Sequence, residues 1–139
     1  MLQRLEDQIK MHNLVSEEQR GFVKGKTCLH NLADLVRIGL RLQEKIQLQI
    51  ESKAPRKTRS RFFFVFIDLA KAFDTVNREK LFSLLYFKNV DSTLVNAIRA
   101  LYSKTVMKVQ DLDVTTKKGV MQGGVLSPKL FAIYIDELL

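Results

Sequence analysis

Hydrophobic residues in the first part of the chain recur at helical spacing. Leu2, Leu5 and Ile9 lie three to four positions apart and predict a short amphipathic helix near the N-terminus. A longer apolar stripe predicts a second helix over residues 29–52, and the glycines of residues 16–26 predict a loop between the two helices. The stripe consists of Leu29, Leu32, Leu35, Val36, Leu42, Ile46 and Ile50.

A continuous apolar run, Phe62–Ile67, ends in an acidic residue. The run is too short to span a membrane and suits a buried strand with Asp68 at its tip. A second carboxylate, Asp74, follows after a short turn. A core strand that ends in a helix-capping Asp has this pattern, and so does a strand that places a metal ligand at the edge of a sheet.

Two further helices and a hairpin are predicted in the second half of the chain. Asn77 is suited to cap one helix, and Asp91 or Ser92 the next, because short polar side chains accept hydrogen bonds from the first helical N–H groups. Residues 105–110 and 112–116 predict two short strands, which form a hairpin that leads into the next segment.

The segment Gly119–Pro128, GVMQGGVLSP, is rich in glycine. Three glycines in six residues allow a ligand to approach the backbone closely, or a positive φ. Ser127 and Pro128 predict the N-cap and the first residue of a helix that continues over residues 130–139. A glycine-rich turn before a helix N-terminus is suited to bind phosphate, although such turns also form for steric reasons alone.

The charge balance points to a class of partner. Lys and Arg number 23 against 15 Asp and Glu, and the net charge of +8 favours a polyanion such as nucleic acid, although basic proteins without such a partner exist. The single cysteine, Cys28, excludes an internal disulfide and fits a reducing, intracellular compartment. Cys28 and His30 are too few for a zinc site, and no signal peptide or membrane span is predicted.

Residues 53–61, KAPRKTRSR, carry five basic side chains, one proline and no acidic residue. This composition predicts an exposed linker. Arg56, Lys57, Arg59 and Arg61 are candidates to contact a nucleic-acid backbone. A nuclear address and an ordinary charged loop fit the same residues.

Three segments together resemble the reverse transcriptase domain, most closely that of non-LTR retrotransposons and group II intron-type enzymes. FIDLAKAFDTV, residues 66–76, is similar to the first palm motif of that family. GVMQGGVLSPKLFAIYIDELL, residues 119–139, is similar to its QG-containing motif and the helix that follows. QRGFVKGKTCLHNLADL, residues 19–35, resembles the fingers motif, and the three segments occur in the order of the family.

The resemblance implies RNA-templated DNA synthesis with an RNA template, a DNA primer and deoxynucleoside triphosphates. In this phosphoryl transfer two divalent ions about 4 Å apart position and neutralise the phosphates. Mg²⁺, or Mn²⁺, is therefore the expected cofactor of the complete domain, held by hard oxygen ligands. Asp68 matches the first catalytic aspartate and metal ligand, and the backbone carbonyl of Leu69 matches a further ligand. Asp74 is expected to cap the turn into the next helix.

The same resemblance implies a nucleotide pocket. Phe73 stands where the family has a bulky aromatic residue that packs beneath the incoming sugar and excludes a 2′-hydroxyl. Gln122 and Gly123 match the QG pair that lines the nucleotide and template pocket. Gly124 stands where family members often carry serine, which removes a hydroxyl and predicts added flexibility.

The fingers motif departs from the family pattern. Val23 and Lys26 stand at the positions where the family has arginines that hold the triphosphate. Lys24 and Lys26 are expected to neutralise phosphate as point charges without the bidentate fork of arginine, with Arg20 as a further cation. For each of these basic residues, a solvated position at the surface fits somewhat better than a specific contact.

The implied fold class is α+β, a partial polymerase palm with part of the fingers. The palm is expected to form a small antiparallel sheet backed by helices. Residues 1–61 are expected to be partial fingers with the long helix and the basic linker, and residues 62–139 the partial palm. The aromatic-x-Asp-Asp motif of the family would follow residue 139, so we expect an incomplete domain without polymerase activity of its own.

Two other classes of function remain open. One is a non-catalytic basic module that binds RNA or DNA. The other is a helical interaction protein that uses the apolar stripe of residues 29–50. Steeply salt-dependent binding of nucleic acid would argue against the interaction protein, and divalent-ion binding lost on Asp68→Ala would favour the enzyme over the module.

Overall fold

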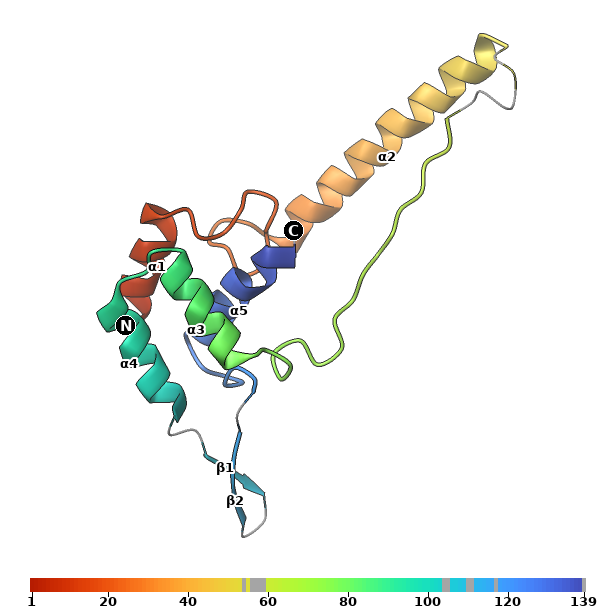
Figure 1. Cartoon of the computed structure of the whole chain (residues 1–139). Coiled ribbons are helices and arrows are strands. Elements are labelled where there is room, and N and C mark those ends of the chain that lie inside the picture. Colours follow the sequence, from red (N-terminus) through yellow and green to blue (C-terminus); the bar gives the residue numbers. More distant parts are fainter. Residues whose placement is uncertain (54, 56–59, 104–105, 110–111, 117, 139) are drawn as a thin grey trace. The chain divides into compact units, whose positions relative to one another are not determined.

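The chain divides into two compact units in a computed structural model (Figure 1), and each unit is considered by itself. The first unit contains Met1–Lys24 and Ala70–Leu139, and the second contains Gly25–Leu69. The predicted boundary between fingers and palm, after residue 61, is not tested by this division and stays a prediction. The structure describes residues 1–53, 55, 60–103, 106–109, 112–116 and 118–138.

In the described part of the first unit, four α-helices build a shared core. They are α1 (Leu2–Met11), α3 (Arg78–Phe87), α4 (Ser92–Ser103) and α5 (Ser127–Ile135), and α5 continues into the 3₁₀ turn η2 (Asp136–Leu138). The apolar faces of all four helices supply side chains that are completely removed from solvent, so the predicted N-terminal helix has a core to pack against. These side chains are Leu5, Leu81, Leu85, Val95, Ile98, Leu130 and Ile133.

The predicted helix caps after the first palm-like motif are confirmed. The side chain of Asn77 accepts a hydrogen bond from the backbone N–H of Lys80 at 3.1 Å, which caps α3. Asp91 accepts from the N–H of Leu94 at 2.8 Å at the start of α4. Each carboxylate or amide oxygen satisfies an N–H group that has no partner within the helix.

The start of α5 differs from the prediction. The N-cap residue is Leu126 rather than Ser127, and Pro128 lies within the first two helical positions. The hydroxyl of Ser127 does not cap the helix, because it points back and donates to the carbonyl of Met121. The helix ends at Ile135, earlier than the predicted residue 139, and the 3₁₀ turn η2 takes its place.

A two-stranded hairpin extends from α4, as predicted. Strand β1 (Val106–Val109) pairs antiparallel with β2 (Leu112–Thr115), with Val106 opposite Thr115 and Val109 opposite Leu112. An isolated antiparallel bridge between Asn77 and Lys118 follows. The hairpin therefore returns the chain to the start of α3.

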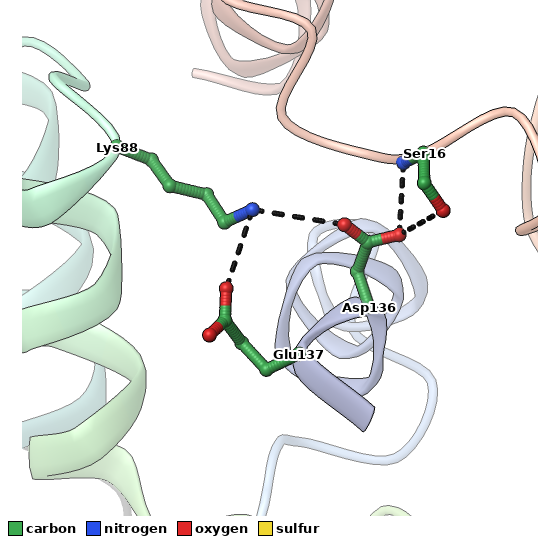
Figure 2. A network of polar contacts seen from close by, with 4 residues as sticks. All are labelled: Ser16, Lys88, Asp136 and Glu137. Carbon is green, nitrogen blue, oxygen red and sulfur yellow. Dashed lines mark hydrogen bonds and ion pairs between the residues drawn. The ribbon is translucent and has the colours of Figure 1, made fainter. Parts of the chain in front are cut away.

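Figure 2 shows a polar network that ties the N-terminal segment to the C-terminal turn. One carboxylate oxygen of Asp136 accepts from the backbone N–H and the hydroxyl of Ser16, at 2.8 and 2.7 Å. The other oxygen lies 3.6 Å from the ammonium of Lys88, which also pairs with Glu137 at 3.3 Å. The side chain of Asp136 is only 8% exposed, so these contacts compensate for the loss of water.

The second unit is dominated by one long helix, α2 (Cys28–Glu51), close to the predicted bounds. The N–H of Thr27 donates to Nδ1 of His30 at 3.1 Å and closes its first turn. No residue of α2 is buried, and its apolar stripe is exposed in the described chain except at Leu42 and Ile46, which are half-buried. Near its C-terminus the side-chain amide of Gln49 bonds the backbone N–H and hydroxyl of Ser60, at 2.8 and 3.0 Å.

The predicted strand over residues 62–68 is not present in the structure. These residues form no regular secondary structure, and Phe63, Val65 and Ile67 are 84%, 82% and 86% exposed. A strand requires a neighbouring strand for its backbone hydrogen bonds, and no described residue provides one here.

The predicted fold class, α+β with a small antiparallel palm sheet backed by helices, is therefore wrong for this chain. The described residues are predominantly helical, and the β1–β2 hairpin is their one paired ribbon. None of the described helices combines the length and apolarity needed to cross a bilayer.

Candidate functional site

Two of the predicted motifs meet in the first unit. The Phe73 turn (residues 70–77) and the glycine-rich turn (residues 119–124) are joined by backbone hydrogen bonds. The N–H of Gly119 donates to the carbonyl of Val76 at 2.8 Å, and the N–H of Val120 donates to the carbonyl of Phe73 at 2.9 Å. Segments more than forty positions apart are therefore held side by side.

The Phe73 turn is closed by its own backbone. The N–H groups of Asp74 and Thr75 both donate to the carbonyl of Lys71, at 3.0 and 3.1 Å, and Lys71 has a positive φ of 51°. The turn brings the ring of Phe73 against the core while Asp74 stays at the surface. The Phe73 turn is therefore a tight turn that leads directly into α3.

Gly119 is required where the two turns touch. Its φ is +85°, a region that residues with a side chain rarely adopt. A Cβ at this position would lie 3.1 Å from both Cα and the carbonyl oxygen of Asp74, and 3.2 Å from the carbonyl oxygen of Phe73. The backbone approach that links the two motifs consequently depends on this glycine.

A side-chain bond also joins the turns. Nε2 of Gln122 donates to Oδ1 of Asp74 at 2.9 Å. The N-cap position of α3 belongs to Asn77, so Asp74 binds the predicted pocket glutamine instead of capping a helix. Sequence reasoning did not pair these two residues, because nothing local relates positions 48 apart.

A buried arginine holds the segment that enters the glycine-rich turn. Nε of Arg78 donates to the carbonyl of Gly119 at 2.7 Å, and Nη1 and Nη2 donate to the carbonyl and hydroxyl of Thr116, at 2.5 and 3.0 Å. Nη1 also donates to the carbonyl of Tyr102 at 3.3 Å, and the guanidinium lies 5.2 Å from the centre of the Tyr102 ring. Arg78 thus joins α3, α4 and the chain after the hairpin.

The environment of Arg78 is unusual for a cation. The residue is 8% exposed, and its burial lowers the pKa of the guanidinium from its ordinary value, while Tyr102 raises it. Carbonyl oxygens and a hydroxyl oxygen accept its hydrogen bonds and replace water. Sequence analysis missed this residue, although one signal was available. Arg78 lies three and seven positions before Leu81 and Leu85 and so falls on the buried face of α3.

Three phenylalanines from the three predicted motifs cluster beside the turns. The rings of Phe73 and Phe131 stack at 4.8 Å with an interplanar angle of 26°. Phe22, from the fingers-like segment, lies edge-on to both, at 5.8 Å from Phe73 and 6.3 Å from Phe131. The predicted gate residue, Phe73, is therefore partly buried between two other aromatic rings.

The two glycines after Gln122 have different surroundings. Gly123 has a φ of +76° and open space around the position of a Cβ. At Gly124 a Cβ would lie 2.7 Å from Oγ of Ser127, which is 2% exposed and bonded to the carbonyl of Met121 and the hydroxyl of Tyr102. The replacement of the family serine by Gly124 thus gives close packing, where flexibility was predicted.

The predicted metal ligands lie at an exposed position of the second unit. Asp68 is exposed, and its Oδ1 accepts the N–H of Leu69 at 2.9 Å. No group of three or more His, Cys, Asp or Glu side chains that could hold a metal ion is found among the described residues. An exposed carboxylate with a neighbouring backbone carbonyl offers hard oxygen atoms of the kind that Mg²⁺ prefers.

The predicted cationic contacts are distributed over the chain. Lys24 is exposed and belongs to the first unit, whereas Lys26 belongs to the second. Arg61 is exposed. Arg56, Lys57 and Arg59 lie outside the described residues, so their predicted contacts with nucleic acid stay predictions.

Comparison with known proteins gives two matches. A family model described as "Reverse transcriptase (RNA-dependent DNA polymerase)" matches residues 1–139. The chain is also 30% identical over 109 residues to a "Retrovirus-related Pol polyprotein from type-1 retrotransposable element R2" of Popillia japonica. The match covers 74% of this chain and 15% of that protein. No solved structure matches.

Proposed function

The chain belongs to the reverse transcriptase family, with a domain of the type found in non-LTR retrotransposons, and from this premise we propose that it forms part of the nucleotide site of an RNA-templated DNA polymerase. The family copies a nucleic-acid template into DNA from deoxynucleoside triphosphates and generally uses divalent metal ions. The observation that carries the proposal is the junction of the Phe73 turn with the glycine-rich turn through Gly119 and Val120.

In this proposal the junction receives the sugar and base of the incoming nucleotide. The ring of Phe73 lies beneath the sugar in this proposal. There it would clash with the 2′-hydroxyl of a ribonucleotide. Gln122 and Gly123 line the pocket for the base and the template. The positive φ of Gly123 and the open space around it suit a backbone that a ligand approaches closely.

Charge neutralisation is assigned to two sets of residues. Lys24 and Lys26 bind the triphosphate as point charges. Asp68 and the backbone carbonyl of Leu69 are the ligands for a divalent ion, which would neutralise the phosphates during transfer. Within the described residues, Oδ2 of Asp68 has no protein partner and remains able to bind a cation.

The inactivity of the isolated chain is part of the proposal. Nucleotidyl transfer with two metal ions requires ligands for both, and the described residues contain no group of three or more metal-binding side chains. We expect no product in primer extension with a primed RNA template, Mg²⁺ and deoxynucleotides. Product that disappears on Asp68→Ala would overturn this expectation.

Nucleotide binding tests the pocket directly. Titration of the 139-residue chain with dATP and Mg²⁺ is followed by NMR shifts of backbone amides. We expect the largest changes in the Phe73 turn and the glycine-rich turn, with weaker binding after Gln122→Ala. Gln8→Ala, on α1, is the control for loss of a glutamine side chain. Shifts confined to residues outside both turns would contradict the proposed site.

A non-catalytic module that binds RNA or DNA is the second candidate, and the net charge of +8 favours it. Both candidates predict nucleic-acid binding that weakens steeply with salt. Binding of Mn²⁺ distinguishes them, because only the polymerase site requires a divalent ion at Asp68. Loss of Mn²⁺ binding on Asp68→Ala, but not on Asp7→Ala, supports the polymerase site. Unchanged binding supports the module.

A further inference from the structure

Phe22 has a strained backbone. Its φ is +60°, in the left-handed region that a bulky residue rarely occupies, although Gly21 stands beside it in the sequence. Such a conformation persists only when surrounding contacts determine it, and it is most common at functional sites. The contacts of Phe22 therefore indicate what the conformation is for.

Lys129 binds the backbone of Phe22. Its ammonium donates to the carbonyl oxygen of Phe22 at 2.8 Å and lies 3.5 Å from Oε1 of Glu6. The side chain of Lys129 is only 20% exposed, so these acceptors replace much of the water around its charge. Through Lys129, α5 fixes the loop that carries Phe22 and, at the same time, contacts α1.

The ring of Phe22 contacts the predicted sugar gate. It lies edge-on to Phe73 at 5.8 Å and 78°, and edge-on to Phe131 at 6.3 Å and 88°. Phe131 is 8% exposed and stacks on Phe73 at 4.8 Å. Phe73 is thus held between a buried ring from α5 and a second ring that is 47% exposed.

We propose that Phe22 and Lys129 are positioning residues that fix the ring of Phe73, and so determine how strongly the site prefers a deoxyribose over a ribose. The inference rests on the proposed function of Phe73. Lys129 holds the carbonyl of Phe22, the strained backbone directs the ring of Phe22 toward Phe73, and edge-on contact limits the movement of the Phe73 ring. Discrimination by a steric gate requires such restriction, because a ring that moves aside admits a 2′-hydroxyl.

A purely structural role for the same contacts predicts a different outcome. If Phe22 and Lys129 served only to attach the loop, their loss would lower stability and weaken binding of deoxynucleotides and ribonucleotides equally. A positioning role changes the ratio of the two affinities. This ratio is therefore the decisive measurement.

The experiment uses the whole 139-residue chain and four variants. Phe22→Leu keeps an apolar side chain but removes the aromatic ring, whereas Phe22→Tyr keeps an aromatic ring at this position. Lys129→Met keeps an unbranched side chain that is one heavy atom shorter and removes its donor. Lys88→Met is the matched control, because Lys88 forms its ion pairs with Asp136 and Glu137, away from the Phe22 carbonyl that Lys129 binds.

Two readouts are taken for each chain, namely the affinities for dATP and ATP with Mg²⁺ and the NMR shifts of the Phe73 ring in ¹³C-phenylalanine-labelled protein. We expect Phe22→Leu and Lys129→Met to move the ring shifts and to reduce the preference for dATP severalfold. Phe22→Tyr should retain the preference, and so should Lys88→Met, even if its unfolding temperature falls.

The outcomes separate the inference from the function on which it rests. A wild-type preference for dATP that survives both Phe22→Leu and Lys129→Met overturns the inference and leaves the Phe73 gate intact. A wild-type chain that binds neither nucleotide, or binds both equally, refutes the gate, and the sugar preference assigned to Phe22 and Lys129 falls with it. In either case, ring shifts of Phe73 that both variants leave unchanged show that the two residues do not position it.

Discussion

The side-chain amide of Gln122 donates to the carboxylate of Asp74 over 2.9 Å, although 48 positions separate the two residues. A carboxylate only accepts hydrogen bonds, so the amide nitrogen must face Asp74 and the amide oxygen is directed away from it. Asp74 therefore selects one of the two orientations of the Gln122 amide. This relationship makes Asp74 part of the proposed pocket.

Asp74→Asn is expected to release the Gln122 amide. An asparagine offers both a donor and an acceptor, so either orientation of Gln122 satisfies it and the fixed direction is lost. ¹⁵N relaxation of the Gln122 side chain should show increased mobility, and dATP binding should weaken. Asp7→Asn is the control, because Asp7 accepts from Gln3 in an equivalent exposed bond at 3.0 Å on α1. Unchanged relaxation of Gln122 in Asp74→Asn would refute this role.

Arg78→Met is expected to destabilise the first unit strongly. The substitution leaves the carbonyls of Gly119 and Thr116 without donors in a buried site, at a cost on the order of 3 kcal/mol in the free energy of unfolding. Urea denaturation measures this loss. Arg99→Met is the control, because Arg99 pairs with Glu79 at the surface and should cost only about 0–1 kcal/mol. Equal losses for the two variants would show that the buried bonds of Arg78 contribute little.

Gly124→Ala is expected to be destabilising because the added Cβ meets a side-chain oxygen and the backbone. It would lie 2.7 Å from Oγ of Ser127, its nearest neighbour, and 3.0 Å from the carbonyl oxygen of Met121, and such overpacking costs about 1–3 kcal/mol. Ser127→Ala removes the side-chain oxygen, so the double variant should lose less stability than the sum of the two single variants. Gly39→Ala, in α2 with no atom near the new Cβ, should be neutral or stabilising. Additive losses in a double-mutant cycle by thermal unfolding would count against the contact.

Asp136→Ala is expected to loosen the N-terminal segment. The substitution removes the single oxygen that accepts both hydrogen bonds of Ser16, together with one partner of Lys88, which leaves partly buried donors unsatisfied at a cost of about 1–3 kcal/mol. Glu137→Ala removes the other, 40% exposed partner of Lys88 and should cost about 0–1 kcal/mol. Hydrogen exchange at the N–H of Ser16 should accelerate only in Asp136→Ala. Acceleration in both variants, or in neither, would contradict the network shown in Figure 2.

The helices were predictable because the determinants of a helix are local. The caps at Asn77 and Asp91 and the apolar spacing of α1 lie within a few residues of the structure that they specify. The β1–β2 hairpin is local in the same sense. The prediction of a strand at residues 62–68 was wrong for the opposite reason. The hydrogen bonds of a strand require a neighbouring strand, which the composition of residues 62–68 cannot supply.

The sequence alone determined the family, the helical segments and the residues of the proposed pocket, because motif order and helical periodicity can be read directly from the order of the residues. Only the tertiary structure decided which residues hold that pocket together. Arg78 reaches Gly119 across 41 positions, and Phe22 meets Phe73 and Lys129 from a distant loop. These contacts depend on how the helices pack around a common core. The pattern of residues along the sequence does not specify that packing.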